Sequence, residues 1–323
     1  MASKEQSFRT RERQLQTEYF RRNLDGKIGH GNDDVRLRPE HMASNLWPGL
    51  HETAVHAFAE EPIIQWHQHA NHGLSSQACC VNFLMPMAHK PGILSRWAGH
   101  VLGITPPEML PVEYRAGQDW YVAFEWIGDR DYLNEGSENG ARKRGASATA
   151  SDAAVKFRAD GKVHLLLIEW KYTEEYRNHR LSEDRRGTRV NRYKDLAFQP
   201  NGPIKSDVGL ELTDFFYEPF YQLLRQQMLA WYVAHDPNSG IDRARVLHLS
   251  PAGNLELHHV TSPCLREIGG DAFEAFAAVL AHPDDFVRTT IEQAFEPLAG
   301  WPEAEWFGWL QARYPSLCRR HTP

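Results

Sequence analysis

Three charged side chains near the middle of the chain have the types and spacing that can hold a divalent metal ion. Glu169 and Lys171 interrupt the apolar run LLLIEWKY, and Asp152 precedes them in the segment SDAAVKFR. Residues two apart on a strand project from the same face, so Glu169 and Lys171 share one face. Burying a charge without a partner costs several kcal/mol, so these side chains need partners on a neighbouring strand.

The turn between the two segments predicts which residues become partners. Asp160-Gly161 is typical of a two-residue hairpin turn, which pairs Ala159 with Lys162 and makes the numbers of paired residues sum to 321. Asp152 and Glu169 satisfy the same sum, so we expect their Cβ atoms to lie about 4.5–5.5 Å apart. Two carboxylates this close repel each other and raise each other's pKa, and a divalent cation between them relieves the repulsion.

The other face of this predicted hairpin is an apolar wall. Its residues alternate with the charged ones and are Ala153, Val155, Phe157, Leu166, Ile168, Trp170 and Tyr172. A Glu-x-Lys spacing arises about once by chance in a chain of this composition and length, and a structural salt bridge at a strand end is an alternative. That alternative leaves the opposed Asp152 unexplained.

The elements around the hairpin follow from apolar periodicity and turn residues. We expect two helices first, then a meander of strands, a long helix and a returning strand. The expected helices cover 75–87, 93–103 and 216–234, with a Ser N-cap at 75, and the strands cover 112–116, 120–128, 152–158, 163–172 and 245–251. Amphipathic spacing predicts three more helices at 271–281, 284–298 and 303–314, and the polar first 60 residues resemble a helical appendage.

Composition restricts the function classes without selecting one. The chain has 323 residues, 41% of them hydrophobic, which is enough for a large core. We find no signal-peptide pattern and no apolar stretch long enough to span a membrane, so we expect a cytoplasmic protein. The formal net charge of −6 means that a nucleic acid would need a local basic surface. No Walker A loop, dinucleotide fingerprint or nucleophile elbow is present.

Ser151-Asp152 followed by Glu169-Trp170-Lys171 resembles the signature of the PD-(D/E)XK superfamily of restriction-endonuclease-like nucleases. The phrases SSQACCVN, SDAAVKFR, LIEWKYTEEY and FYEPFYQLLRQQ are similar to bacterial members of it. The resemblance implies an α/β fold with a restriction-endonuclease-like core: helix, antiparallel meander, helix and strand around a mixed central sheet. We therefore expect an N-terminal helical appendage at 1–64, the nuclease-like core at 65–262, and C-terminal helices at 263–323 packed on the same domain. Ser151 stands where the family has proline, which only shapes the entry to the strand.

The resemblance also implies a metal site and a reaction. Asp152 and Glu169 would be carboxylate ligands of Mg²⁺, with Mn²⁺ as a substitute, and the backbone carbonyl of Trp170 would be a third ligand. This set leaves coordination positions for a nucleophilic water and a phosphate oxygen. Lys171 would orient or help deprotonate that water and stabilise charge on the phosphate.

Several polar residues are candidates for additional roles at this site. Ser76 and Gln77 could contact metal-bound water, although we favour a helix-capping role for them. Glu125 either faces the site or reaches solvent at a strand end. On the helix after the signature, Gln222 or Gln226 could hold substrate, and an ordinary solvated face is the alternative.

Basic residues flank the signature on both sides and predict a nucleic-acid-binding surface. They are Arg142, Lys143 and Arg144 before Asp152, and Arg185, Arg186, Arg189 and Arg192 after Lys171. The fold analogy favours DNA over RNA, in restriction, defence or repair, and leaves a homodimer open. His67, His69 and His72 match no metal-binding helix motif, and we expect them on a surface segment.

The leading hypothesis is therefore a Mg²⁺-dependent nuclease that hydrolyses phosphodiester bonds, and two alternatives remain. The first is a catalytically inactive nucleic-acid-binding protein with the same fold. The second is an unrelated α/β enzyme that uses its Asp/Glu pair on a small substrate in a closed pocket.

Overall fold

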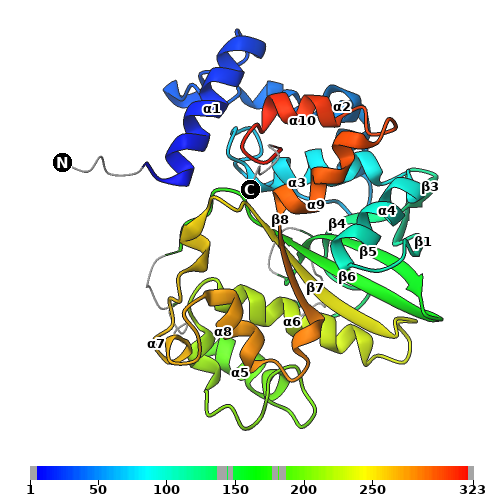
Figure 1. Ribbon diagram of the computed structural model, residues 1–323, viewed down its shortest axis with the longest axis vertical. Coiled ribbons are helices and arrows are strands. Elements are labelled where there is room, and N and C mark those ends of the chain that lie inside the picture. The colour runs from blue at the N-terminus through cyan, green and yellow to red at the C-terminus, as the bar shows by residue number, and fades with distance from the viewer. Residues whose placement is uncertain (1–5, 137–143, 145–147, 177–180, 182–186, 319–323) are drawn as a thin grey trace.

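A mixed β-sheet with helices on both faces forms the centre of the molecule (Figure 1). The computed structural model describes residues 6–136, 144, 148–176, 181 and 187–318. Within these ranges the main sheet has six strands, and a separate pair of short strands lies beside it. The arrangement is an α/β fold of the restriction-endonuclease-like kind, as the sequence predicts.

The strands of the main sheet combine antiparallel and parallel pairing. Strands β1 and β4 both pair with β5 in antiparallel fashion, and β5 pairs with β6 through a hairpin. Strand β7 then pairs in parallel with β6, and β8 pairs in parallel with β7. The strand bounds are β1 Glu108–Leu110, β4 Val122–Trp126, β5 Ser151–Ala159, β6 Lys162–Trp170, β7 Arg243–Ser250 and β8 Phe286–Thr290, with β2 Glu113–Arg115 and β3 Gln118–Trp120 in the short pair.

The predicted hairpin register is confirmed. Residue pairs run from Ala159–Lys162 to Ala153–Ile168, so the paired numbers sum to 321 throughout. Asp160 and Gly161 adopt φ values of 50° and 73°, the left-handed conformations that a two-residue turn of this kind requires. A local turn therefore determines which residues of β5 face those of β6.

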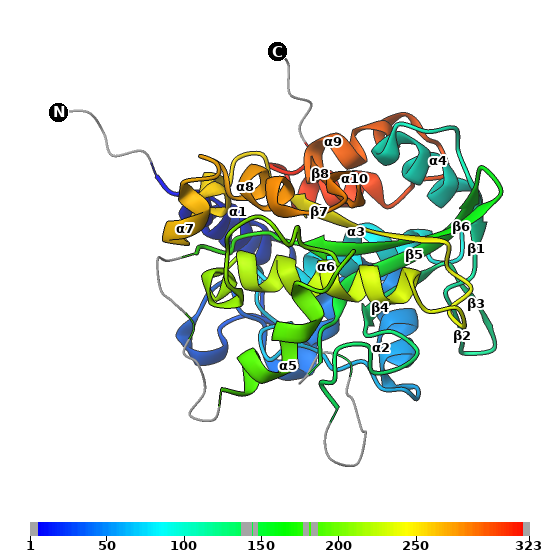
Figure 2. The ribbon, with the colours of Figure 1, turned by 90° about the horizontal axis from the view of Figure 1, so that it is seen from below.

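Helices cover the two faces of the sheet in two groups (Figures 1 and 2). Helices α3, α4, α9 and α10 pack on the face formed by the apolar wall, and α5, α6 and α8 pack on the other face. The helix bounds are α1 Phe8–Asn23, α2 His51–Ala59, α3 Ser76–Leu84, α4 Pro91–Leu102, α5 Thr188–Ala197, α6 Phe220–Ala234, α7 Pro263–Arg266, α8 Ala272–Val279, α9 Ile291–Phe295 and α10 Phe307–Arg313. In the described part of the chain, no helix has the length and apolarity to cross a bilayer.

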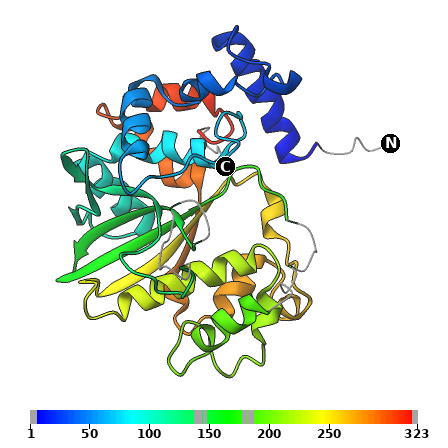
Figure 3. The ribbon, with the colours of Figure 1, turned by 180° about the vertical axis from the view of Figure 1, so that it is seen from behind.

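The N-terminal segment, which the sequence analysis expects as a helical appendage at 1–64, packs into the hydrophobic core. Phe8 and Leu46 belong to the same hydrophobic cluster as Phe83 of α3 and Leu310 of α10. Figure 3 shows the first helix, in blue, beside the red C-terminal helices. The three segments 1–64, 65–262 and 263–323 therefore bury apolar surface against one another.

The C-terminal helix expected at 284–298 is wrong over its first half. Phe286–Thr290 forms strand β8, which pairs in parallel with β7, and a helix begins only at Ile291. Valine and threonine favour strands, and without β8 the strand β7 would present an unpaired edge. The helical periodicity of this segment predicts a helix, but pairing with the edge of β7 favours a strand. That edge exists only once the sheet has formed.

We predict that the hairpin turn depends on the backbone freedom of Gly161. Gly161→Ala should lower the free energy of unfolding by about 1–2 kcal/mol, because a Cβ in the left-handed region is strained. A Cβ at Gly161 meets no atom within 4 Å, so a clash would not contribute. Gly92→Ala is the matched control, since Gly92 lies in the first turn of α4 with equally open space and should tolerate a Cβ. Equal effects of both substitutions in urea denaturation would contradict the prediction.

Candidate functional site

The three signature residues meet where β5 begins and β6 ends. The paired ladder stops at Ala153–Ile168, one residue before Asp152 and Glu169. There Asp152 takes over the pairing with its side chain, because the backbone N–H of Trp170 donates to its Oδ2 at 2.7 Å. The register thus brings Asp152 to the neighbourhood of Glu169, as the turn predicts.

Glu169 and Lys171 form a buried ion pair. Their side chains are only 1% and 9% exposed, and Lys171 Nζ donates to Glu169 Oε1. Burial by itself would lower the pKa of Lys171, but the neighbouring carboxylate of Glu169 outweighs it and the pKa lies well above its ordinary value. Lys171 therefore carries a fixed positive charge inside the site.

Asp152 is the carboxylate whose charge is least compensated. Burial raises its pKa well above the ordinary value, and the charge of Glu169 raises it further. The positive charge of Lys171 and the hydrogen bond from Trp170 only partly oppose this shift. A cation placed beside Asp152 would offset the same unfavourable energy.

Glu125 is a third carboxylate at this position of the sheet. The β4–β5 register pairs Phe124 with Ala153 and Trp126 with Ser151, so Glu125 comes opposite Asp152. Its φ of 47° lies in the left-handed region, which for a non-glycine residue costs about 1–3 kcal/mol and is concentrated at functional sites. Burial raises the pKa of Glu125. Of the two alternatives, Glu125 faces the site.

Helix α3 supplies the contacts that hold Glu125 and Trp170. Gln77 Nε2 donates to Glu125 Oε1 at 2.8 Å, and Ser76 Oγ donates to the carbonyl of Trp170 at 3.3 Å. The helix is capped by Ser75, whose Oγ accepts from Ala78 N at 3.2 Å. The capping role that we favoured for Ser76 and Gln77 is therefore wrong, and both side chains turn toward the site.

Helix α6 contributes a glutamine from the opposite side of the sheet. Gln226 is 2% exposed, and its Nε2 donates to Glu169 Oε2 at 3.0 Å and to the Ala150 carbonyl at 2.6 Å. Glu169 thus has one oxygen bound by Lys171 and the other by Gln226. A solvated face is excluded for Gln226, while Gln222 lines the cavities in front of the site.

Two cavities meet at these carboxylates. One, of about 530 Å³, is lined by α5 and α6 residues, and the other, of about 520 Å³, is lined by residues that precede and begin α3. Glu125, Asp152 and Gln222 line both. The carboxylates of Glu125 and Asp152 therefore lie between the two cavities.

The basic residues that were predicted to bind nucleic acid lie in different environments. Arg189 and Arg192 of α5 line the first cavity together with Asp152. Arg144 is buried, pairs with Glu113 at 2.6 Å and donates to the carbonyl of Glu125 at 3.1 Å, so its expected contact with nucleic acid is corrected to a structural role. Arg142, Lys143, Arg185 and Arg186 lie outside the described residues.

The sequence analysis did not assign the N-terminal residues that line the second cavity. Arg9 and Arg36 line it, as do His67, His69 and His72, which we had expected only on a surface segment. His67 and His69 are indeed exposed. The sequence did offer a signal for the histidines. They directly precede the Ser75 cap of α3, and a helix that packs against the signature strands brings the residues before it close to the site.

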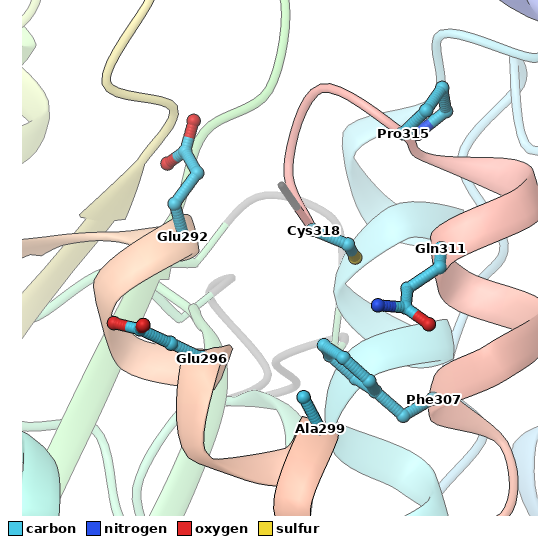
Figure 4. Close-up of a pocket in the computed structure, with 7 residues that line it drawn as sticks. All are labelled: Glu292, Glu296, Ala299, Phe307, Gln311, Pro315 and Cys318. Atoms are coloured by element: carbon cyan, nitrogen blue, oxygen red, sulfur yellow. The ribbon is translucent and has the colours of Figure 1, made fainter. Parts of the chain in front are cut away.

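A further cavity, of about 500 Å³, contains none of the predicted site residues. It lies between Glu292 and Glu296 on one side and Phe307 and Gln311 on the other, and Cys318 borders it (Figure 4). The signature residues therefore have no part in it.

The donor chemistry at the signature fits a hard cation. Carboxylate and carbonyl oxygens are the ligands that Mg²⁺ prefers. Among the described residues, no group of three or more His, Cys, Asp or Glu side chains has the geometry to hold a metal ion. The predicted ligand set contains only two such side chains, Asp152 and Glu169, and its third member is the backbone carbonyl of Trp170.

Comparison with known proteins identifies the family of the chain. A family model described as "Restriction Endonuclease associating with ARP" matches residues 9–315, nearly the whole chain. No curated protein matches, and no solved structure matches.

We predict that Asp152 destabilises the metal-free protein. The raised pKa means that folding favours the protonated form, so stability falls as pH rises from the ordinary carboxylate pKa through the raised one. Asp152→Asn should therefore raise the free energy of unfolding by about 1–3 kcal/mol at pH 8 with chelator, and the gain should shrink at pH 4. Denaturant unfolding at both pH values measures it.

Asp207→Asn is the control for this prediction. Asp207 is exposed and lies away from the site, so this substitution removes the same formal charge without affecting the site. A pH-independent loss of stability in Asp152→Asn would show that its hydrogen bond to Trp170 matters more than its charge.

Proposed function

Because the chain belongs to the family described as restriction endonuclease associating with ARP, we propose that it is a Mg²⁺-dependent nuclease hydrolysing phosphodiester bonds, with DNA favoured over RNA. The observation that carries the proposal is the convergence of three acidic residues, Glu125, Asp152 and Glu169, on Lys171 where two cavities meet. This arrangement supports the site that the resemblance to PD-(D/E)XK nucleases implies, with Glu125 as an additional carboxylate.

The ligands for Mg²⁺ would be Asp152, Glu169 and the carbonyl of Trp170, and Glu125 would add negative charge beside them without being a ligand. The raised pKa values of Asp152 and Glu125 support a cation at this place, because its charge would offset their burial. When bound, Mg²⁺ supplies Lewis acidity and lowers the pKa of a coordinated water. Mn²⁺ accepts the same oxygen ligands and would substitute.

Lys171 would act as a fixed cation and not as a base. Its raised pKa keeps the ammonium protonated at neutral pH, so it can donate hydrogen bonds to a phosphate oxygen and stabilise negative charge that develops there. Gln226 would serve as a positioning residue, since it holds Glu169 Oε2 in place. Of the two roles that the resemblance implied for Lys171, charge stabilisation is the better supported.

The surface around the carboxylates suits a polyanion. Arg189 and Arg192 line the cavity on the α5 side together with Glu125 and Asp152. Cations that contact phosphates position a nucleic acid without reading its sequence. We propose this side as part of the substrate-binding surface.

A second candidate is a nucleic-acid-binding protein with the same fold and no catalysis. The direct ion pair between Lys171 and Glu169 favours it, because the ammonium already neutralises one of the proposed metal ligands. The two candidates make opposite predictions about metal binding and cleavage.

We predict divalent-metal-dependent cleavage that requires the signature residues. With Mg²⁺ or Mn²⁺, wild-type protein should cut at least one of linear, supercoiled or single-stranded DNA or RNA, and Asp152→Ala and Lys171→Ala should each lose roughly a hundredfold or more in rate. Gel-based cleavage assays measure this. Lys162→Ala is the matched control, because Lys162 is an exposed lysine at the other end of β6. Undiminished cleavage by both signature variants would overturn the assignment.

We also predict that metal binding stabilises the wild-type protein through Asp152. Mg²⁺ at a hundred times its dissociation constant should add about 2.7 kcal/mol to the free energy of unfolding, which thermal unfolding detects as a higher Tm. Asp152→Asn should show little or no shift. An absence of any metal-induced shift in wild type, together with retained DNA binding, would favour the non-catalytic candidate.

A further inference from the structure

We propose that the N-terminal segment forms a second wall of the substrate-binding cleft, in which Arg9 and Arg36 contact the phosphate backbone of the nucleic acid. The inference rests on the proposed function, since it assigns a binding surface to the same substrate. It goes beyond that function by giving substrate contacts to the N-terminal segment, where the sequence analysis placed none.

The second cavity brings this wall to the signature residues. Arg9 and Arg36 line the same volume of about 520 Å³ as Asp152 and Lys171. The backbone carbonyl of Thr173, two residues after Lys171, accepts a hydrogen bond from Arg9 NH1 at 3.4 Å. The N-terminal wall therefore begins directly beside the proposed reactive centre.

A buried polar network holds helix α1 in place against the end of the signature strand. Tyr172 OH donates to Glu12 Oε2 at 2.6 Å, and Gln16 Nε2 donates to Tyr172 OH at 3.2 Å. Gln16 Nε2 also donates to the carbonyl of Arg313 at 2.9 Å. Because Glu12 and Gln16 are buried, Arg9 one turn earlier projects from a helix with a defined position relative to Lys171.

The charges of Arg9 and Arg36 are largely uncompensated. Within the described ranges Arg9 forms no ion pair. Arg36 Nε forms a long ion pair with Asp33 Oδ2 at 3.9 Å, but Asp33 is shared, because Arg13 binds it at 2.7 Å and His72 contacts it at 3.4 Å. Arg9 and Arg36 therefore carry more positive charge than Asp33 alone neutralises, and guanidinium groups bind phosphate oxygens well.

The histidines of this wall would add hydrogen bonds and not charge. Burial lowers the pKa of His72 to about 4, and burial also lowers the pKa of His69, with Arg36 nearby adding to the effect. Both imidazoles are therefore neutral at neutral pH. The cationic character of the wall depends on Arg9 and Arg36.

The two walls together suggest the path of the substrate. Arg189 and Arg192 line the cavity on the α5 side, Arg9 and Arg36 line the cavity on the N-terminal side, and Asp152 lines both. A nucleic-acid strand that crosses both cavities passes the carboxylates with cations before and after them. The substrate would then be held on each side of the bond that is cut.

The test measures binding without cleavage. In an Asp152→Asn background with chelator, fluorescence anisotropy of a labelled DNA duplex gives Kd as a function of salt. Arg9→Ala combined with Arg36→Ala should weaken binding on the order of tenfold at physiological salt and reduce the slope of log K against log salt by about 1.8, since each phosphate contact contributes about 0.9. Arg9→Lys with Arg36→Lys should restore most of the slope.

Arg22→Ala is the matched control, because Arg22 is exposed on the same helix about 20 Å from Arg9 and should leave Kd and slope unchanged. If the double variant does not fold, Arg9→Glu alone tests the wall, because Arg9 is exposed and the substitution should weaken DNA binding without unfolding the protein. Binding that is weakened by Arg189→Ala with Arg192→Ala but not by the N-terminal variants would overturn this inference and leave the proposed function standing. Absence of DNA binding in the parent would overturn this inference for duplex DNA and also the preference for DNA over RNA in the proposed function.

Discussion

The burial of several charges at one point of a sheet that is covered on both faces is the constraint on which this structure depends. Helix α6 packs over the face that carries Glu169 and Lys171, so these side chains cannot rely on water for solvation. Each is instead satisfied by a specific partner: Lys171 binds one oxygen of Glu169, and Gln226 binds the other. A buried polar network of this kind is favourable only when nearly all of its members are paired. Asp152 is the member whose charge stays partly uncompensated, which is why a cation suits the site.

The same constraint explains why elements distant in the sequence surround the signature. Glu125 is held through its side chain by Gln77 of α3 and through its backbone by Arg144. Tyr172, which follows the signature directly, is bound by Glu12 of α1. The N-terminal segment, predicted as a helical appendage, thus completes the hydrogen bonding at the end of β6, and as a consequence Arg9 lies at the cleft.

The errors of the sequence analysis have a common cause. The segment that forms β8 has helical apolar spacing, yet it becomes a strand because β7 would otherwise present an unpaired edge. Arg144 reads as a solvent-exposed basic residue, yet it is buried against Glu113. Glu125 could not be oriented by alternation, because its positive φ interrupts the alternation of β4 and places Trp126 in the same cluster as Ala123. For β8 and for Arg144 the deciding partner, β7 or Glu113, lies far away along the chain.

What the sequence determined by itself is local in origin. The Asp160-Gly161 turn sets the register of the hairpin, and the two-residue period of a strand puts Glu169 and Lys171 on one face, so the pairing with Asp152 follows without any distant contact. Only the tertiary structure decided that Gln77, Glu125 and Gln226 surround these residues and that Arg9 and Arg36 line the same cleft. Those positions depend on how the helices pack across the sheet. Packing depends on how several segments fit together, and the separation of these segments in the sequence does not tell how close they lie in space.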